Sequence, residues 1–125
     1  YKRQSLSSSE ISYESEAIFA NAIIYFEFDK SNLTTKSLQT LKSTVNALEE
    51  NPAIGLTLSG HADERGTREY NLALGQRRAE TVAEYLILNG ISKSRIIVKS
   101  YGEEMPAMLG QNEKSYAKNR RVEIN

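Results

Sequence analysis

The sequence predicts an α+β fold in which a mixed four-stranded sheet carries two main helices on one face. In residues 23–28 and 54–58, apolar and polar residues alternate at the period of a strand that buries one side. After each of these stretches, apolar residues recur every three or four positions, as on the buried face of a helix. Two shorter apolar stretches follow, so the expected order is βαβαββ with a loop between the last two strands.

The strands are predicted from alternation and from β-branched residues. The first begins near Ile23 and ends at Asp29, before a turn over residues 30–32. Its inward-facing residues are expected to be Ile24, Phe26 and Phe28. The later strands contain, in order, Ile54, Leu56 and Leu58; Ile96, Ile97 and Val98; and Val122 with Ile124. Residues 101–117 are predicted to form a long connection with one helical turn.

Both helices are predicted from their end residues and a buried stripe. Thr34 or Thr35 can cap the first, and Asn51-Pro52 ends it. Its apolar face consists of Leu38, Leu41, Val45 and Leu48. Thr67 caps the second, which runs to about Asn89 before Gly90. Its buried stripe is expected to contain Leu72, Gly75, Ala79, Val82 and Leu86, with Ala83 beside it.

Two adjacent arginines of the second helix are not equivalent. At about 100° per residue, Arg78 falls with Asn71 at the margin of the buried stripe, whereas Arg77 projects nearly opposite, into solvent. Leu74 lies on the same ridge as Arg78, outside the stripe, and is expected to line a groove with it.

Length and composition favour one domain, residues 21–125, preceded by a serine-rich linker or tether, residues 1–20. Sixteen basic and sixteen acidic residues give a net charge of zero, so nucleic acid is not an expected partner. Cysteine is absent, which excludes disulfides and thiolate metal sites. Because the chain begins with Tyr1 rather than Met, we expect a processed or trimmed fragment.

The loop between the second strand and second helix contains the candidate binding site. Ligands tend to lie where a strand ends and a helix begins, and Asp63 lies there with Arg65 as its one obvious local partner. A carboxylate and a guanidinium facing one pocket suit a zwitterion, with Asp63 holding an ammonium group and Arg78 a carboxylate. The alternative for Arg78 is a structural arginine that passes the core and pairs with a nearby carboxylate.

Catalysis and metal binding are not favoured. His61, Asp63 and Glu64 are residue types that bind metals or move protons, but they point in different directions at a strand end. The chain has one histidine, and no second cluster has ligand spacing. His61 is expected to be a polar residue at a strand end, and we expect no enzyme activity, no metal and no cofactor.

Several ordered motifs between residue 23 and residue 125 resemble the OmpA-like peptidoglycan-binding domain family. They are Tyr25-Phe26-Glu27-Phe28-Asp29, Gly60-His61-Ala62-Asp63, Asn71-x-x-Leu74-x-x-x-Arg78-Ala79-x-x-Val82, Tyr101-Gly102-Glu103 and Asn119-Arg120-Arg121-Val122-Glu123. Within the family, Glu64-Arg65-Gly66-Thr67 with Glu69-Tyr70-Asn71 resembles the Pal group, the peptidoglycan-associated lipoproteins.

The resemblance implies non-covalent binding of peptidoglycan stem peptides through meso-diaminopimelate, whose free amino acid end is a zwitterion. The family's ligand-binding aspartate and arginine correspond to Asp63 and Arg78. The remaining residues implied to complete the site are Phe28, Asp29, Arg65, Thr67 and Leu74. Such a protein tethers the outer membrane to the cell wall from its periplasmic side, as part of the Tol-Pal system.

The Pal group also binds the β-propeller protein TolB on an overlapping face, so a protein-protein adaptor with little peptidoglycan affinity is the alternative function. The group is anchored in the outer membrane by lipid on an N-terminal cysteine, which is missing here and is inferred to lie upstream of Tyr1. Two positions depart from the family pattern: Ala62 replaces a common threonine, and Asn32 a common aspartate.

Overall fold

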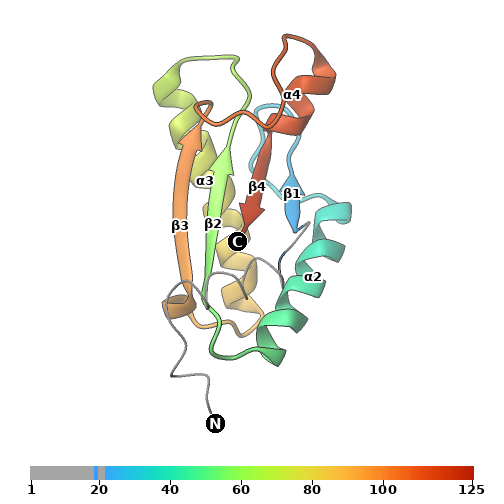
Figure 1. The fold of residues 1–125 in the computed structure, drawn as a ribbon, viewed down its shortest axis with the longest axis vertical. Helices are drawn as coiled ribbons and strands as arrows, with labels where there is room; N and C mark the ends of the chain where they lie inside the picture. The colour runs from blue at the N-terminus through green and yellow to red at the C-terminus, as the bar shows by residue number, and fades with distance from the viewer. Residues whose placement is uncertain (1–18, 20–21) are drawn as a thin grey trace.

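A four-stranded sheet forms the centre of the molecule, with strands in the order β1-β4-β2-β3 (Figure 1). The computed structural model describes residue 19 and residues 22–125. The strands and helices are β1 Ile23–Tyr25, α2 Thr35–Glu50, β2 Leu56–His61, α3 Arg68–Leu88, η2 Lys93–Arg95, β3 Ile96–Gly102, α4 Glu113–Asn119 and β4 Arg121–Ile124. The sheet is mixed, because β2 pairs in parallel with β3 while β4 pairs antiparallel with β1 and β2.

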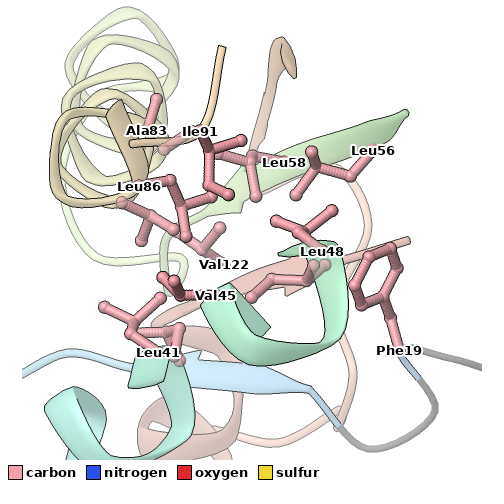
Figure 2. Close-up of a cluster of buried hydrophobic side chains, with 14 of the residues drawn as sticks. Phe19, Leu41, Val45, Leu48, Leu56, Leu58, Ala83, Leu86, Ile91 and Val122 are labelled. Atoms are coloured by element: carbon pink, nitrogen blue, oxygen red, sulfur yellow. The ribbon is translucent and has the colours of Figure 1, made fainter. Parts of the chain in front are cut away.

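The α+β prediction is confirmed, with α2 and α3 packed over one shared core. Leu41, Val45 and Leu48 of α2 meet Leu86 of α3 and Leu58 of β2 in this core (Figure 2). The predicted linker, residues 1–20, lies outside the described residues except for Phe19, whose side chain is buried in the same core.

Both long helices begin and end where the sequence predicts. The hydroxyl of Thr34 accepts a hydrogen bond from the backbone N–H of Ser37, and that of Thr67 accepts one from Tyr70. Asn51 follows the last turn of α2. Asn89 follows α3, and Gly90 then adopts φ +96°, the left-handed conformation that ends many helices.

The prediction that the first strand reaches Asp29 is wrong. β1 ends at Tyr25, and Phe28 and Asp29 form a turn in which the Lys30 N–H donates to the Glu27 carbonyl over 3.1 Å. The partner strand β4 begins only at Arg121, opposite Tyr25, so no strand of residues 22–125 is available beyond that point. Phe28 is consequently 53% exposed instead of facing the core.

Two further expectations need correction. The predicted connection, residues 101–117, contains the last two residues of β3 and the first five of α4, a helix of seven residues capped by Asn112, rather than one helical turn. Leu72 is 48% exposed, not buried. It lies beside β3, the edge strand, where the Ser100 hydroxyl donates to its carbonyl over 2.6 Å, and no further strand among the described residues covers its side chain.

A close backbone approach between β2 and α3 fixes the position of the loop that joins them. A Cβ atom added to Gly60 would lie 1.8 Å from the carbonyl oxygen of Gly75. Only two glycines allow the helix to lie this close to the strand.

Gly60→Ala is therefore expected to destabilise the fold by about 3 kcal/mol or more, because backbone rather than a flexible side chain must move. Urea unfolding measures this free energy directly. Gly55→Ala is the matched control, since its nearest neighbour, the Arg95 carbonyl oxygen, would be 3.4 Å from the new Cβ. Equal unfolding free energies for the two variants would contradict the packing described here.

Candidate functional site

A pocket of about 380 Å³ lies where β2 ends and α3 begins, facing the turn after β1. All of the site residues predicted from the sequence contribute to its wall: Phe28, Asp29, Asp63, Arg65, Thr67, Leu74 and Arg78. Ala62, Gly66, Tyr70 and Asn71 complete the wall. The structure therefore brings together residues from three separate segments of the chain.

Arg78 is fully buried and bonded to three backbone carbonyls. Its Nε donates to Lys30 over 2.8 Å, Nη1 to His61 over 2.9 Å and Nη2 to Glu27 over 3.1 Å. The side chain thus joins α3 to the end of β2 and to both sides of the turn at Phe28 and Asp29. The expectation that a structural arginine here would pair with a carboxylate is wrong, because its direct partners are carbonyls.

Burial lowers the pKa of Arg78 to about 10, and the charge of Asp63 opposes this change. The guanidinium still carries its proton at neutral pH. Of its five N–H groups, the three bonds to carbonyls leave one on each Nη atom. Arg77, by contrast, is exposed on α3, as its position around the helix predicts. Its guanidinium lies over the ring of Tyr70.

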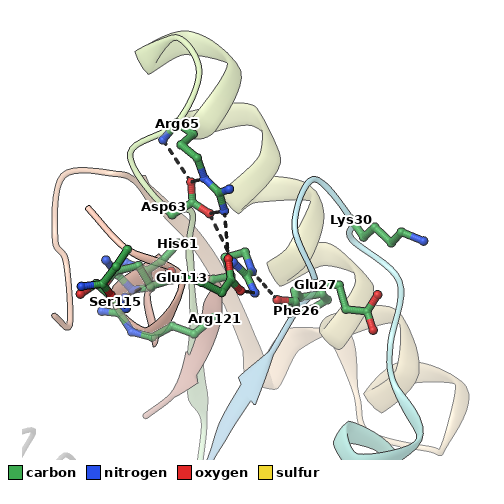
Figure 3. Close-up of polar contacts among 12 residues, drawn as sticks. Phe26, Glu27, Lys30, His61, Asp63, Arg65, Glu113, Ser115 and Arg121 are labelled. Carbon is green, nitrogen blue, oxygen red and sulfur yellow. Dashed lines mark hydrogen bonds and ion pairs between the residues drawn. The ribbon is translucent and has the colours of Figure 1, made fainter. Parts of the chain in front are cut away.

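Asp63 is buried and bonded by its neighbour Arg65 (Figure 3). The backbone N–H and Nε of Arg65 donate to Oδ1 over 3.0 and 3.1 Å, and Nη2 donates to Oδ2 over 2.9 Å. Burial alone would raise the pKa of Asp63, but these hydrogen bonds and the charges of Arg65 and Arg120 hold it below its ordinary value. Asp63 is therefore ionised at neutral pH.

Arg120 is a site residue that sequence reasoning missed. Its Nε donates to the Phe26 carbonyl over 2.9 Å and its Nη2 to Glu113 over 2.9 Å. Nη1 lies 3.7 Å from Oδ2 of Asp63 and makes no hydrogen bond within the described part of the chain. The motif containing Arg120 was visible in the sequence, but nothing in its spacing placed it beside a residue nearly 60 positions earlier.

Two aromatic rings contact the Arg65 guanidinium. Its carbon lies 4.0 Å from the ring centre of Phe28 and 4.2 Å from that of Tyr116 in α4. Hydrogen bonding to Asp63 raises the pKa of Arg65, so this cation is permanent. Tyr116 and Glu113, whose Oε1 lies 3.8 Å from Nη2 of Arg65, were also missed, because α4 was expected to be part of a loop.

The other side of the pocket holds a second carboxylate. Asp29 has φ +57°, and the Tyr70 hydroxyl donates to it. This bond raises the pKa of Tyr70. Nearby, the buried side chain of Asn71 donates to Glu103 over 2.8 Å. Tyr70 and Asn71 lie in the first turn of α3, next to the predicted cap Thr67. This position is the sequence signal that could have identified them as site residues.

His61 is more buried than expected for a strand end, with 2% of its surface exposed. Its ring stacks on Tyr101, and neither ring nitrogen has a hydrogen-bond partner among the described residues. Burial and the charge of Arg121 lower its pKa from 6.5 to about 4, with Glu123 acting in the opposite direction. The ring is thus neutral at physiological pH, while its backbone carbonyl holds Arg78.

This buried ring predicts a specific acid sensitivity. Between pH 6.5 and 4 the unfolded chain binds a proton at His61 that the folded protein does not, so the free energy of unfolding should fall as pH falls. Urea unfolding across this range should show a smaller pH dependence for His61→Phe, which keeps a ring against Tyr101. Parallel pH profiles for the two proteins would show that the folded ring titrates normally. Asp63 makes the free energy of unfolding depend on pH in a lower range, because its pKa is already low in the unfolded chain and is lower still in the folded protein.

No α-helix among residues 22–125 combines the length and apolar composition needed to span a bilayer. Within the same range, no three histidine or carboxylate side chains are grouped as metal ligands.

Comparison with known proteins connects this geometry to a family. The OmpA family profile matches residues 25–120. A "Peptidoglycan-associated lipoprotein" of Legionella pneumophila is 47% identical over 104 residues, covering 83% of this chain and 59% of that protein. One from Pseudomonas aeruginosa is 44% identical over 108 residues, covering 86% and 64%. The chain thus spans roughly three-fifths of the length of these relatives.

Solved structures agree. The crystal structure of the peptidoglycan-associated lipoprotein from Burkholderia pseudomallei superposes with a TM-score of 0.79 at 39% identity, covering 82% of this chain and 86% of that one. The C-terminal domain of Helicobacter pylori MotB has a TM-score of 0.76 at 21% identity, with 82% and 81% covered, and shares the fold. By sequence and by structure, this chain belongs to the OmpA family.

Proposed function

We propose that this chain binds peptidoglycan non-covalently through the meso-diaminopimelate of its stem peptides. The observation that supports this most is the set of opposite charges on one small pocket: the carboxylates of Asp29 and Asp63, and the guanidinium groups of Arg65 and Arg78. An amino acid end, with an ammonium and a carboxylate group on one carbon, matches such a pair of charges. The pocket volume, about 380 Å³, suits the end of a side chain rather than a glycan strand.

The two charged contacts have distinct roles in this proposal. Asp63 receives the ligand's ammonium group. The remaining N–H groups on Nη1 and Nη2 of Arg78 can hold the ligand's carboxylate as a fork, while the other three keep the pocket in shape. Arg78 would then be structural and ligand-binding at once, so the two alternatives drawn from the sequence do not exclude each other.

Charges alone are insufficient for useful affinity. Two charge-assisted contacts contribute about 1.5 to 3 kcal/mol each, whereas micromolar binding needs about 8 kcal/mol. Apolar contact with Phe28 and Leu74, both on the pocket wall, and backbone N–H groups at the start of α3 would supply the remainder. Repeated stem peptides beside a tethered domain would raise the effective affinity further.

The names of the relatives support the cellular role. Proteins called peptidoglycan-associated lipoproteins are similar over most of this chain, and we infer that the full-length protein is likewise lipid-anchored. It would lie on the periplasmic side of a Gram-negative outer membrane, tethering that membrane to the cell wall within the Tol-Pal system. The function is binding without turnover.

A protein partner is the second candidate, and one observation favours it. At the pocket end of the molecule, large apolar side chains are exposed on the wall and on the neighbouring loop: Phe28, Tyr70, Met105 and Leu109. Arg68 pairs with Glu104 over 3.2 Å, which connects that loop to the start of α3. We propose this end as the face for TolB, which would then compete with peptidoglycan.

The direct test is titration with a diaminopimelate-containing stem peptide and with its lysine-containing counterpart. The lysine side chain ends in an ammonium group without a carboxylate, so we expect at least tenfold weaker binding, the effect of about 1.4 kcal/mol. Calorimetry measures both affinities. Equal affinities would contradict a pocket that recognises a zwitterion.

Sedimentation with purified sacculi tests the same assignment on the polymer. Asp63→Asn should remove the chain from the pellet, because the amide no longer offers a charge to an ammonium group. Arg77→Ala, one position from Arg78 but exposed, is the control and should sediment normally. A chain that binds TolB but never sediments with sacculi would favour the adaptor function, and release of soluble muropeptides would indicate an enzyme.

A further inference from the structure

Asp63, which the proposed function assigns to a ligand's ammonium group, already has a cationic partner. Both of its oxygens accept hydrogen bonds from the Arg65 side chain, and its own side chain is 4% exposed. An ammonium group approaching from the pocket therefore has to take the place of a guanidinium.

Two arginines contact Asp63, and they differ in how firmly they are held. The Arg120 side chain is 8% exposed and is fixed by the Phe26 carbonyl and by Glu113. The Arg65 side chain is 35% exposed, and within the described part of the chain its hydrogen bonds go to Asp63 alone. Arg65 is consequently the one that can move without breaking contacts elsewhere in the sheet.

The surroundings of Arg65 define where it would go. The guanidinium carbon lies 4.0 Å from the centre of the Phe28 ring and 4.2 Å from that of the Tyr116 ring, so a guanidinium that moves along these rings keeps its cation–π contacts. Glu113 already lies 3.8 Å from Nη2, and its side chain is 70% exposed. A second carboxylate is thus within reach of the same nitrogen.

We propose that Arg65 exchanges partners when ligand binds, passing from Asp63 to Glu113 while it stays in contact with these two rings. Tyr116 and Glu113 of α4 are then positioning residues that determine how readily Asp63 becomes accessible. This inference rests on the proposed function, since it concerns the same ammonium group. It also adds specificity, because a ligand without an ammonium group leaves the Asp63–Arg65 pair in place.

The exchange is observable through the Nε–H group of Arg65 by nuclear magnetic resonance. Its signal is assigned by its loss in Arg65→Lys, and the natural chain is then titrated with the diaminopimelate-containing stem peptide. We expect the signal to shift, and its exchange with solvent to change by tenfold or more, as the peptide saturates. Saturation seen at Leu74 or Thr67 with an unchanged Arg65 signal would overturn the exchange and leave the proposed function standing. If no signal moves, the proposed function and the exchange both fail.

Affinity measurements on two variants test the positioning residues. Glu113→Gln should weaken peptide binding about two- to fivefold, the range expected for an exposed ion pair, whereas Glu84→Gln on the far part of α3 should not. Tyr116→Leu removes one of the two rings that contact the Arg65 guanidinium and should weaken binding to a similar extent, whereas Tyr116→Phe keeps that ring and should restore binding. Unchanged affinity in Glu113→Gln and Tyr116→Leu would exclude a role for α4.

Discussion

The binding end of this molecule depends on one buried guanidinium, that of Arg78. Placing a charge out of reach of water costs several kcal/mol unless its polar groups are satisfied. Here three backbone carbonyls accept hydrogen bonds from three of its five N–H groups, and they belong to the turn after β1 and to the last residue of β2. Since α3 supplies the arginine, a single side chain sets the distances between all three segments of the pocket wall.

This arrangement also explains the local irregularities. The carbonyls of Glu27 and Lys30 face Arg78 instead of a neighbouring strand, which, together with the start of β4 at Arg121, accounts for the early end of β1 and for the exposure of Phe28. Asp29 between them adopts φ +57° and faces the pocket. Residues that the alternating sequence pattern places in a strand are thus made available to a ligand.

Around this cation, the charged side chains of the pocket wall balance. Asp29 and Asp63 carry two negative charges, and Arg65 and Arg78 carry two positive ones. A neutral set of alternating charges attracts neither anions nor cations over long distances, but it can exchange partners with a zwitterion at no net cost in charge. The local charges therefore agree with the neutral composition of the whole chain.

The sequence predicts the parts of the structure that depend on neighbouring residues. Alternation identified β2, and cap residues such as Thr34 and Thr67 located the helix starts correctly, because these signals act over a few positions. Leu72 and Phe28 were misplaced because their burial depends on where the sheet ends, which local periodicity does not contain. Arg120 and Tyr116 were missed for a similar reason, since their contacts with the pocket join distant segments. For Arg78, the helical spacing predicted its place at the margin of the buried stripe, but it could not predict the three carbonyls that accept its hydrogen bonds.

The most direct test of this account is Arg78→Lys, measured for both stability and binding of the stem peptide. Lysine keeps the charge, but its ammonium group cannot reach three carbonyls held in the plane of a guanidinium. We expect a loss of about 3 kcal/mol in the free energy of unfolding, the scale for breaking a buried charged contact, together with loss of peptide binding while the chain remains folded. A lysine variant with the same free energy of unfolding and the same affinity for the peptide as the natural chain would contradict the central role given to this guanidinium.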